Sequence, residues 1–510
     1  MNSIELSLFQ HRIQAICDEM GAVLRGSAFS PNIKDRLDFS CAVFDADGAL
    51  CAQAAHIPVH LGSMAYAMAA IVARTDWHDG DMLILNDPYL GGTHLPDVTL
   101  IAPVFADGDP VAFVANRAHH ADIGASRPGS MPVARRLEEE GLIISPTRIS
   151  AGGKIVPDTL DGILARLNNP DSGRADLNAQ ISANERGSRL LRNYIEDLGR
   201  GNFRRALDEI NDYAERLARS GLARLPRGEF TFTDCMDDDG LGREDIPIRA
   251  TVRIADDVHV DFAGSGARVD GNINCPLPVT AAAVYYCFYC LMPPETPACA
   301  GSFRPLSLAV PEGSLLNARP PAAVAAGNVE TSSRIVDVIL GALAQAAPAL
   351  IPAASHGSMN NIAMGAAGWD YYETLGGGMG GAPSGPGPGA VQTHMTNTLN
   401  TPIEVVEMHY PLRIRRYAVR RGAGGAGRHA GGDGLQREYE FTRPASVTLI
   451  TERRRHAPWG LNGGSAGAPG RNLLNGEILP GKCQFEAVPG DRLLIETPGG
   501  GAWGVEPGSD

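Results

Sequence analysis

The spacing of apolar residues in the N-terminal part of the chain predicts alternating helices and strands. Helical intervals separate the apolar side chains of about the first 25 residues, namely Ile4, Leu8, Ile13, Ile16, Met20 and Leu24. A hairpin is predicted at "CAVFDADGALCA", with Asp-Ala-Asp-Gly as its turn, and a helix is predicted from Leu61 to about residue 75. Strands are then predicted over 81–87, 98–105 and 110–120, the last two joined by the turn "ADGDP".

The remaining chain continues this mixture of elements. Helical spacing recurs over 160–170, 175–199 and 204–225. Strands are predicted over 228–236, 247–254 and 258–264. A further helix is predicted from Ser332, with Thr331 or Ser332 as its N-cap, and from Tyr410 onward strands alternate with glycine-heavy turns.

These elements predict a mixed α+β fold with several domains, because 510 residues exceed what one ordinary core can bury. We expect an N-terminal α/β domain over 1–225 that carries the candidate site, and a mixed β/α domain over 226–321. A C-terminal domain over 322–510 should contain a helix followed by a β-rich tail.

Charge and composition exclude several function classes. The net charge is -14 and no long basic block is present, which argues against nucleic acid as a partner. The longest apolar run, Val279 to Met292, is too short to cross a membrane, and no export signal is visible. Nine cysteines without framework spacing favour a reducing cytoplasm, and we interpret the pair Cys287 and Cys290 as part of a buried helical face.

The glycine-rich segments give little support to nucleotide binding. The runs at Gly376 and Gly422 satisfy G-x-G-x-x-G, but neither lies between a strand and a helix of a βαβ unit. No G-x-x-x-x-G-K-[ST] sequence is present, so if the reaction uses ATP, this chain shows no P-loop to hold it.

Polar residues gather in two loops that follow neighbouring predicted strands. "NDPYLGGTHLPDV" places His94 and Asp97 in a loop pinned by glycine and proline, and "NRAHHADIG" supplies His119 and His120. Strand alternation directs these last two to opposite faces. Two histidines and a carboxylate form a ligand set suited to Zn, Mn or Fe. Spacing alone leaves a second interpretation open, in which the histidines hydrogen-bond inside a core and Asp97 caps a turn.

Longer segments resemble a known family over nearly the whole chain. The segments that carry the resemblance include "EMGAVLRGSAFSPNIKDRLDFSCAVFD", "HIPVHLGSM", "NDPYLGGTHLPDVTLIAPVF", "AHHADIG", "GNVETSSRIVDVILGAL", "HGSMNNIAMG" and "TNTLNTPIEVVEMHYPLR". They resemble the hydantoinase B family, which comprises the B subunits or halves of ATP-dependent hydantoinases, 5-oxoprolinases and caprolactamase-type enzymes, with the related carboxylase α subunits. The resemblance implies that His94, Asp97 and His119 hold a divalent metal ion, Mn or Zn.

The resemblance also implies a division of labour between two subunits. An A-type ATPase subunit would use ATP to phosphorylate the oxygen of a cyclic amide, and this B-type subunit would open the ring with metal-activated water. An A2B2 hetero-oligomer is the assembly we expect. One difference is the sequence from Asp122 to Ala125, "DIGA", where many relatives have "DIGG".

The chemistry needs further groups around the metal. Asp87, Asp122 and His120 are the candidates for orienting ligands and transferring protons, although Asp87 could equally accept a hydrogen bond in the turn ahead of Pro88. Weaker candidates for substrate contact, each with a structural role as the alternative, are His60, His356, Asn360 and Glu373.

Two other functions stay open at this point. One is the α subunit of an acetone-carboxylase-like, ATP-dependent carboxylase, although such subunits are typically much longer than this chain. The other is a non-catalytic scaffold for the A subunit, which would not need a polar cluster at two neighbouring strand ends.

Overall fold

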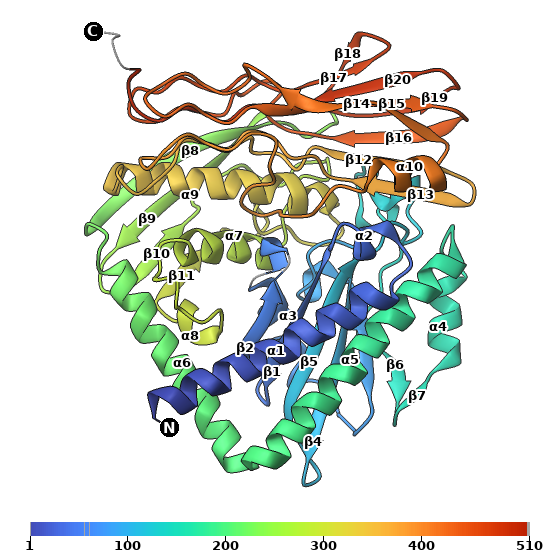
Figure 1. The fold of residues 1–510 in the computed structure, drawn as a ribbon, viewed down its shortest axis with the longest axis vertical. Coiled ribbons are helices and arrows are strands. Elements are labelled where there is room, and N and C mark those ends of the chain that lie inside the picture. Colours follow the sequence, from blue (N-terminus) through green and yellow to red (C-terminus); the bar gives the residue numbers. More distant parts are fainter. Residues whose placement is uncertain (1, 56, 61, 507–510) are drawn as a thin grey trace.

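The computed structural model describes residues 2–55, 57–60 and 62–506, and within them the backbone forms four β-sheets with packed helices. The fold is α+β, with several domains and a β-rich C-terminal region, as predicted. Figure 1 shows the C-terminal strands stacked on the long helix α9 (Ser332–Ala346), with the N-terminal sheet and its helices on the other side. The division of the chain at 225 and 321 stays a prediction. Among the described residues, no helix has the length and apolar character needed to cross a membrane.

The N-terminal sheet is antiparallel and buried on both faces. Its strands, in pairing order, are β2 (Leu50–Ala55), β1 (Phe39–Asp45), β5 (Asp109–His119), β4 (Asp97–Ala106), β3 (Met82–Leu85), β6 (Thr147–Ala151) and β7 (Lys154–Ile155). Alternation along β3 sends Met82 and Ile84 into one core and Leu83 and Leu85 into the other, as the two-residue period of a strand requires. The predicted hairpins at 41–52 and 98–120 are confirmed.

Long helices cover one face of this sheet. They are α1 (Ser3–Ser27) and α5 (Pro170–Leu198), with the shorter α2 (Pro31–Lys34) and α4 (Pro157–Leu164) beside them. The next helix, α6 (Arg200–Leu222), packs against α1 and α5. Asn2 and Glu5 form a reciprocal capping box at the start of α1. On the opposite face lies α3 (Ser63–Val72), and the predicted start of that helix, Leu61, is outside the described residues.

The middle of the chain forms a second sheet against which α9 packs. Its strands, in order, are β11 (Leu306–Ala309), β10 (Val258–Asp261), β9 (Glu244–Ile254) and β8 (Gly228–Asp238), with α7 (Leu277–Tyr289) and α8 (Ala300–Phe303) nearby. Cys287 is buried in α7, whereas Cys290 lies just past the helix and is exposed, so the interpretation of one buried face fails for Cys290.

A π-helical turn, η5 (Gly327–Thr331), runs directly into α9. Thr331 takes the predicted N-cap position, but neither predicted hydroxyl caps the helix with a hydrogen bond. Thr331 donates its hydroxyl hydrogen to the carbonyl of Ile273, and Ser332 donates to that of Asn328. Single π-turns of this kind interrupt regular helices and often lie at functional sites.

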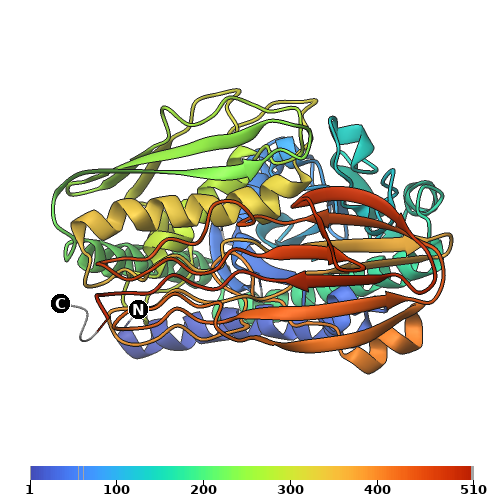
Figure 2. The same ribbon diagram turned by 90° about the horizontal axis from the view of Figure 1, so that it is seen from above.

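Two further sheets form the C-terminal region, seen edge-on at the top of Figure 1 and from above in Figure 2. One contains, in order, β13 (Trp369–Glu373), β12 (Asn361–Ala366), β16 (Ala445–Ile450) and β19 (Lys482–Ala487). The other contains β14 (Leu412–Arg420), β15 (Gly434–Phe441), β20 (Arg492–Glu496), β17 (Arg471–Leu474) and β18 (Glu477–Leu479), preceded in the chain by α10 (Ile403–His409). The four predicted C-terminal strands are confirmed as β14, β15, β16 and β20, whereas β12, β13, β17, β18 and β19 were missed.

Candidate metal centre

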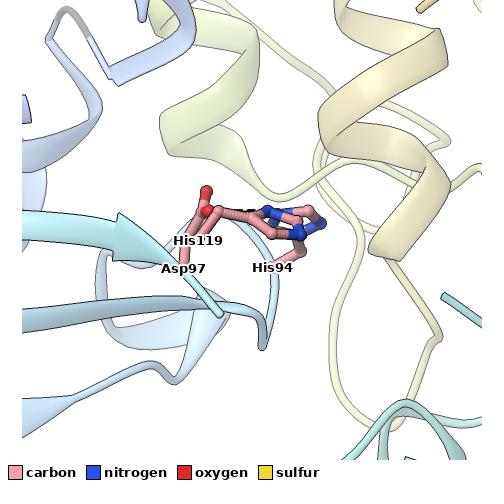
Figure 3. A group of neighbouring side chains, drawn as sticks. All are labelled: His94, Asp97 and His119. Atoms are coloured by element: carbon pink, nitrogen blue, oxygen red, sulfur yellow. Dashed lines mark ion pairs between the residues drawn. The ribbon is translucent and has the colours of Figure 1, made fainter. Parts of the chain in front are cut away.

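Strand pairing brings the candidate ligands together. Asp97 is the first residue of β4 and His119 is the last residue of β5, and the antiparallel register places them directly opposite each other. His94 lies in the loop that leads into β4. Figure 3 shows the three side chains converging where the two strands end. The hairpin therefore closes a sequence gap of more than twenty residues.

The loop that carries His94 is held rigidly at its base. The side chain of Asn86 donates to the carbonyls of Leu95 and Leu142 and accepts from the amide of Ile144. These three hydrogen bonds tie the loop to a neighbouring segment. A ligand must be held within a fraction of an ångström, so this pinning suits a binding site.

The distances within the group suit a metal ion. His94 Nε2 lies 3.2 Å and His119 Nδ1 lies 3.3 Å from Asp97 Oδ1. One ligand atom from each of the three buried residues lies within 4.8 Å of the others. His94 Nδ1 lies 3.3 Å from the carbonyl oxygen of Ala325, so its hydrogen can be donated there while the Nε2 lone pair faces Asp97.

Ring nitrogens of His94 and His119 that lack hydrogen-bond partners also suit a metal site. His94 Nε2 and His119 Nε2 are buried and have no hydrogen-bond partner among the described residues. Burial lowers the pKa of His119, which favours the neutral imidazole that binds metals. Burial alone would raise the pKa of Asp97, but the neighbouring imidazoles, first that of His94, hold it well below its usual value. Imidazole nitrogens, that of His119 favoured in its neutral form, and an ionised carboxylate thus fit a divalent ion such as Zn or Mn.

The second oxygen of Asp97 has its own neighbours. Thr93 donates its hydroxyl hydrogen to Oδ2, Asn328 Nδ2 lies 3.5 Å away, and His60 Nε2 lies 3.4 Å away. The other ring nitrogen of His60 lies 2.9 Å from the Ser40 hydroxyl. The structure therefore places His60, a predicted substrate contact, directly beside the candidate ligands.

The predicted proton-transfer residues have other partners. Asp87 accepts from the amide of Tyr89, 2.9 Å away, which is the turn role left open for it. Asp122 accepts from the amides of Gly124 and Asn169, at 3.0 and 2.7 Å.

His120 lies on the opposite side of β5 from His119, as strand alternation predicts. Its Nε2 is 2.9 Å from Gln180 Oε1 of α5. His120 and Asp122 line a separate pocket of about 340 Å³. None of the three proton-transfer candidates shares a hydrogen bond with Asp97 among the described residues, and their catalytic role stays a prediction.

The remaining substrate candidates lie in buried polar surroundings. Glu373 is ion-paired with Arg36 at 3.0 Å and with Arg437 at 3.5 Å, which is a structural environment. Asn360 accepts from Arg454 at 2.7 Å. His356 is buried with both ring nitrogens unpartnered among the described residues. Their substrate roles stay predictions.

Residues from the second half of the chain complete the site, and sequence reasoning missed them. Asn328 of η5 reaches Asp97, and the ring of Tyr372 stacks on His119 with centroids 4.5 Å apart and planes 14° from parallel. The polar cluster Asn328, Glu330 and Thr331 in the middle of a largely apolar stretch was the available signal.

Fold and site together define an α+β protein with a buried His–Asp–His group of metal-ligand character at the end of a β-hairpin. The hydantoinase B/oxoprolinase family model matches residues 2–506. The chain belongs to this family.

Individual relatives agree with this membership. The chain is 39% identical to 5-oxoprolinase 1 of Arabidopsis thaliana, with 98% of this chain but only 42% of that protein aligned. It is 31% identical to the putative B-type subunit of a D-/L-hydantoinase from a Pseudomonas species, with 96% of this chain and 88% of that protein aligned. The chain thus spans well under half of the plant relative.

Solved structures share the fold. The ATP-dependent caprolactamase of Pseudomonas jessenii superposes with a TM-score of 0.93 at 27% identity, covering 100% of this chain and 93% of that one. A nucleotide-free acetone carboxylase has a TM-score of 0.87 at 16% identity, covering 99% of this chain and 76% of that one, and shows the fold alone.

Proposed function

We propose that this chain is the hydrolytic B-type component of an ATP-dependent cyclic amide hydrolase of the hydantoinase or oxoprolinase type. The observation that carries the proposal is the buried group of His94, Asp97 and His119 in a member of this family. The Pseudomonas relative, named as one of the subunits of a hydantoinase, supports the existence of a partner. An A-type ATPase subunit would activate the amide oxygen with ATP.

His94, Asp97 and His119 would hold the divalent ion. Bound there, the ion supplies a Lewis acid and a water molecule whose pKa is lowered toward neutrality. The ionised Asp97 fixes both imidazoles, and Thr93 and His60 hold its second oxygen. All five side chains are buried, so electrostatic interactions with a substrate there are stronger than in water.

The carboxylase alternative has less support. The acetone carboxylase chain is aligned over 76% of its length, whereas the caprolactamase chain is aligned over 93% with higher identity. Incubation with ATP, bicarbonate and acetone separates the two, because only the carboxylase forms acetoacetate.

The decisive experiment is Asp97→Asn in the complex reconstituted with the A-type subunit. ADP and ring-opened acid are measured in the same reaction. Asparagine still accepts a hydrogen bond but lacks the charge that helps to hold the ion, so ring opening should stop while subunits still associate. Wild-type rates of ring opening by Asp97→Asn would remove this site from the mechanism. Ring opening by the wild-type chain without ATP or partner would refute the division of labour.

A further inference from the structure

Glu330 is a buried carboxyl group that the proposed mechanism has not yet used. It lies in the π-turn η5, and its side chain is fully buried. Oε1 accepts from the amide of Met359 at 3.0 Å and from Asn361 Nδ2 at 2.6 Å. Oε2 has no hydrogen-bond partner among the described residues. A buried oxygen without a partner is unfavourable unless a proton or a ligand satisfies it.

Other buried glutamates near the site are satisfied. Glu452 pairs with Lys482 and, at 3.0 Å, with Arg334. Glu140 accepts one backbone amide hydrogen on each of its two oxygens. Glu330 has no ion pair among the described residues, and besides Met359 and Asn361 only the neutral hydroxyl of Ser358 acts as a donor to its carboxyl group. The absence of a paired cation therefore distinguishes it from carboxylates whose role is to hold the fold together.

Contacts on both sides connect Glu330 to the candidate metal centre. Asn361, which binds Glu330, accepts from the Tyr372 hydroxyl at 2.7 Å, and the Tyr372 ring stacks on His119. On the same π-turn, Asn328 reaches Asp97. The π-turn thus places the carboxyl group of Glu330 beside Asn361, which leads through Tyr372 to His119, and on the same turn as Asn328, which contacts Asp97.

The surroundings of Glu330 keep a proton on it near neutral pH. Burial, followed by the nearby carboxylate of Glu452, raises the pKa of Glu330 to about 7. The cations of Lys482 and Arg454 and the hydroxyl of Ser358 oppose this rise. A carboxyl group with a pKa close to the working pH is suited to proton transfer in either direction.

We propose that Glu330 is the general acid that protonates the ring nitrogen as the cyclic amide opens. This inference rests on the proposed function. In the activated substrate the amide oxygen carries the phosphoryl group and the ring nitrogen is double-bonded to carbon. One water molecule adds its oxygen to this carbon, and one of its protons goes to the ring nitrogen. The C–N bond then breaks, its electron pair stays on nitrogen, and nitrogen takes the proton from Glu330. The carbon is left as an acyl phosphate, and the other proton of the water restores the carboxyl group of Glu330. A second water molecule displaces phosphate from the acyl phosphate, so the net change is addition of two water molecules and release of phosphate.

The test is Glu330→Gln in the complex with the A-type subunit, with caprolactam, 5-oxoproline and hydantoin as probes. Glutamine keeps the oxygen that accepts from Met359 and Asn361 and removes only the transferable proton. Ring opening per ADP formed should fall about 10²–10⁴-fold, while metal content and KM stay within about threefold. The matched control is the exposed Glu477→Gln, which should leave ring opening unchanged.

Two readouts distinguish an acid from a structural residue. In the wild-type complex, the ratio of ring-opened acid to ADP should fall as the pH rises through about 7, because the carboxyl loses its proton. Tyr372→Phe keeps the stacked ring but loses the bond to Asn361, so it should retain this pH dependence.

Each outcome bears on a separate claim. A wild-type ratio that does not fall with pH overturns the role of Glu330 even if the glutamine variant fails to fold. A folded Glu330→Gln variant with a wild-type ratio and pH profile overturns it too, and leaves the hydrolase function intact. A wild-type complex that opens none of the three rings refutes the hydrolase proposal, and the acid role falls with it.

Discussion

Replacing Gly327 with alanine tests whether the candidate centre depends on close backbone packing of the π-turn. A β-carbon at this position would lie 1.9 Å from the carbonyl oxygen of Asn274, more than 1 Å inside ordinary van der Waals contact. That carbonyl cannot withdraw easily, because the side chain of Asn274 is hydrogen-bonded to the backbone of Val269 and Gly271. The π-turn itself must therefore move.

The expected size of the effect follows from this geometry. Overpacking a well-packed core typically destabilises a protein by about 1–3 kcal/mol, and a clash with fixed backbone lies at the upper end. We expect a loss of about 3 kcal/mol in the free energy of unfolding. Movement of the turn also withdraws Asn328 from Asp97, and loss of such outer contacts typically lowers metal affinity about 10–100-fold.

Urea unfolding and metal titration measure the two effects separately. The matched control is Gly162→Ala in α4, where an added β-carbon meets no atom within 4 Å. Because alanine is the better helix former, this control should gain about 0.5–1 kcal/mol and keep its metal affinity. Equal stability and equal metal affinity of Gly327→Ala and the wild type would refute the packing argument.

Three further predictions concern the site and its surroundings. Purified chain should hold about one divalent ion, and elemental analysis should find it lost from folded His94→Ala and His119→Ala. Calorimetry should detect no tight binding of ATP to the isolated chain, since it carries no P-loop. Burial would raise the pKa of Asp234, but Arg334 and Arg453 lower it to about 2, so it contributes about 2 kcal/mol of stability above pH 4 that disappears toward pH 2. Asp234→Asn should flatten that part of the pH dependence of unfolding.

Local sequence patterns were enough to predict the framework of the site. Two strands with a short turn between them form a hairpin, and a hairpin brings its two outer ends together. The proximity of Asp97 to His119 follows from that geometry. The opposite directions of His119 and His120 follow from the two-residue period of a strand.

Long-range contacts, and hydrogen bonds that compete with the expected local ones, could not be predicted from the sequence in the same way. The approach of Asn328 and Tyr372 to the hairpin joins segments more than 200 residues apart, which no local period encodes. Thr331 resembled an N-cap, but its hydroxyl bonds to a backbone carbonyl, an alternative always open to threonine. Strand β12 was missed because "NIAMGA" holds a single β-branched residue.

The split of the centre between early and late segments has a consequence for how the protein is made. Within this sequence, all three proposed ligands precede Tyr372, which covers His119, by roughly 250 residues or more. At translation rates of about 5–20 residues per second, the ligands stay uncovered on the ribosome for roughly 10–50 s. Until then, an ion bound by the three proposed ligands would exchange with the surrounding pool. Its identity would therefore be set late in translation, when the π-turn and β13 close over the hairpin.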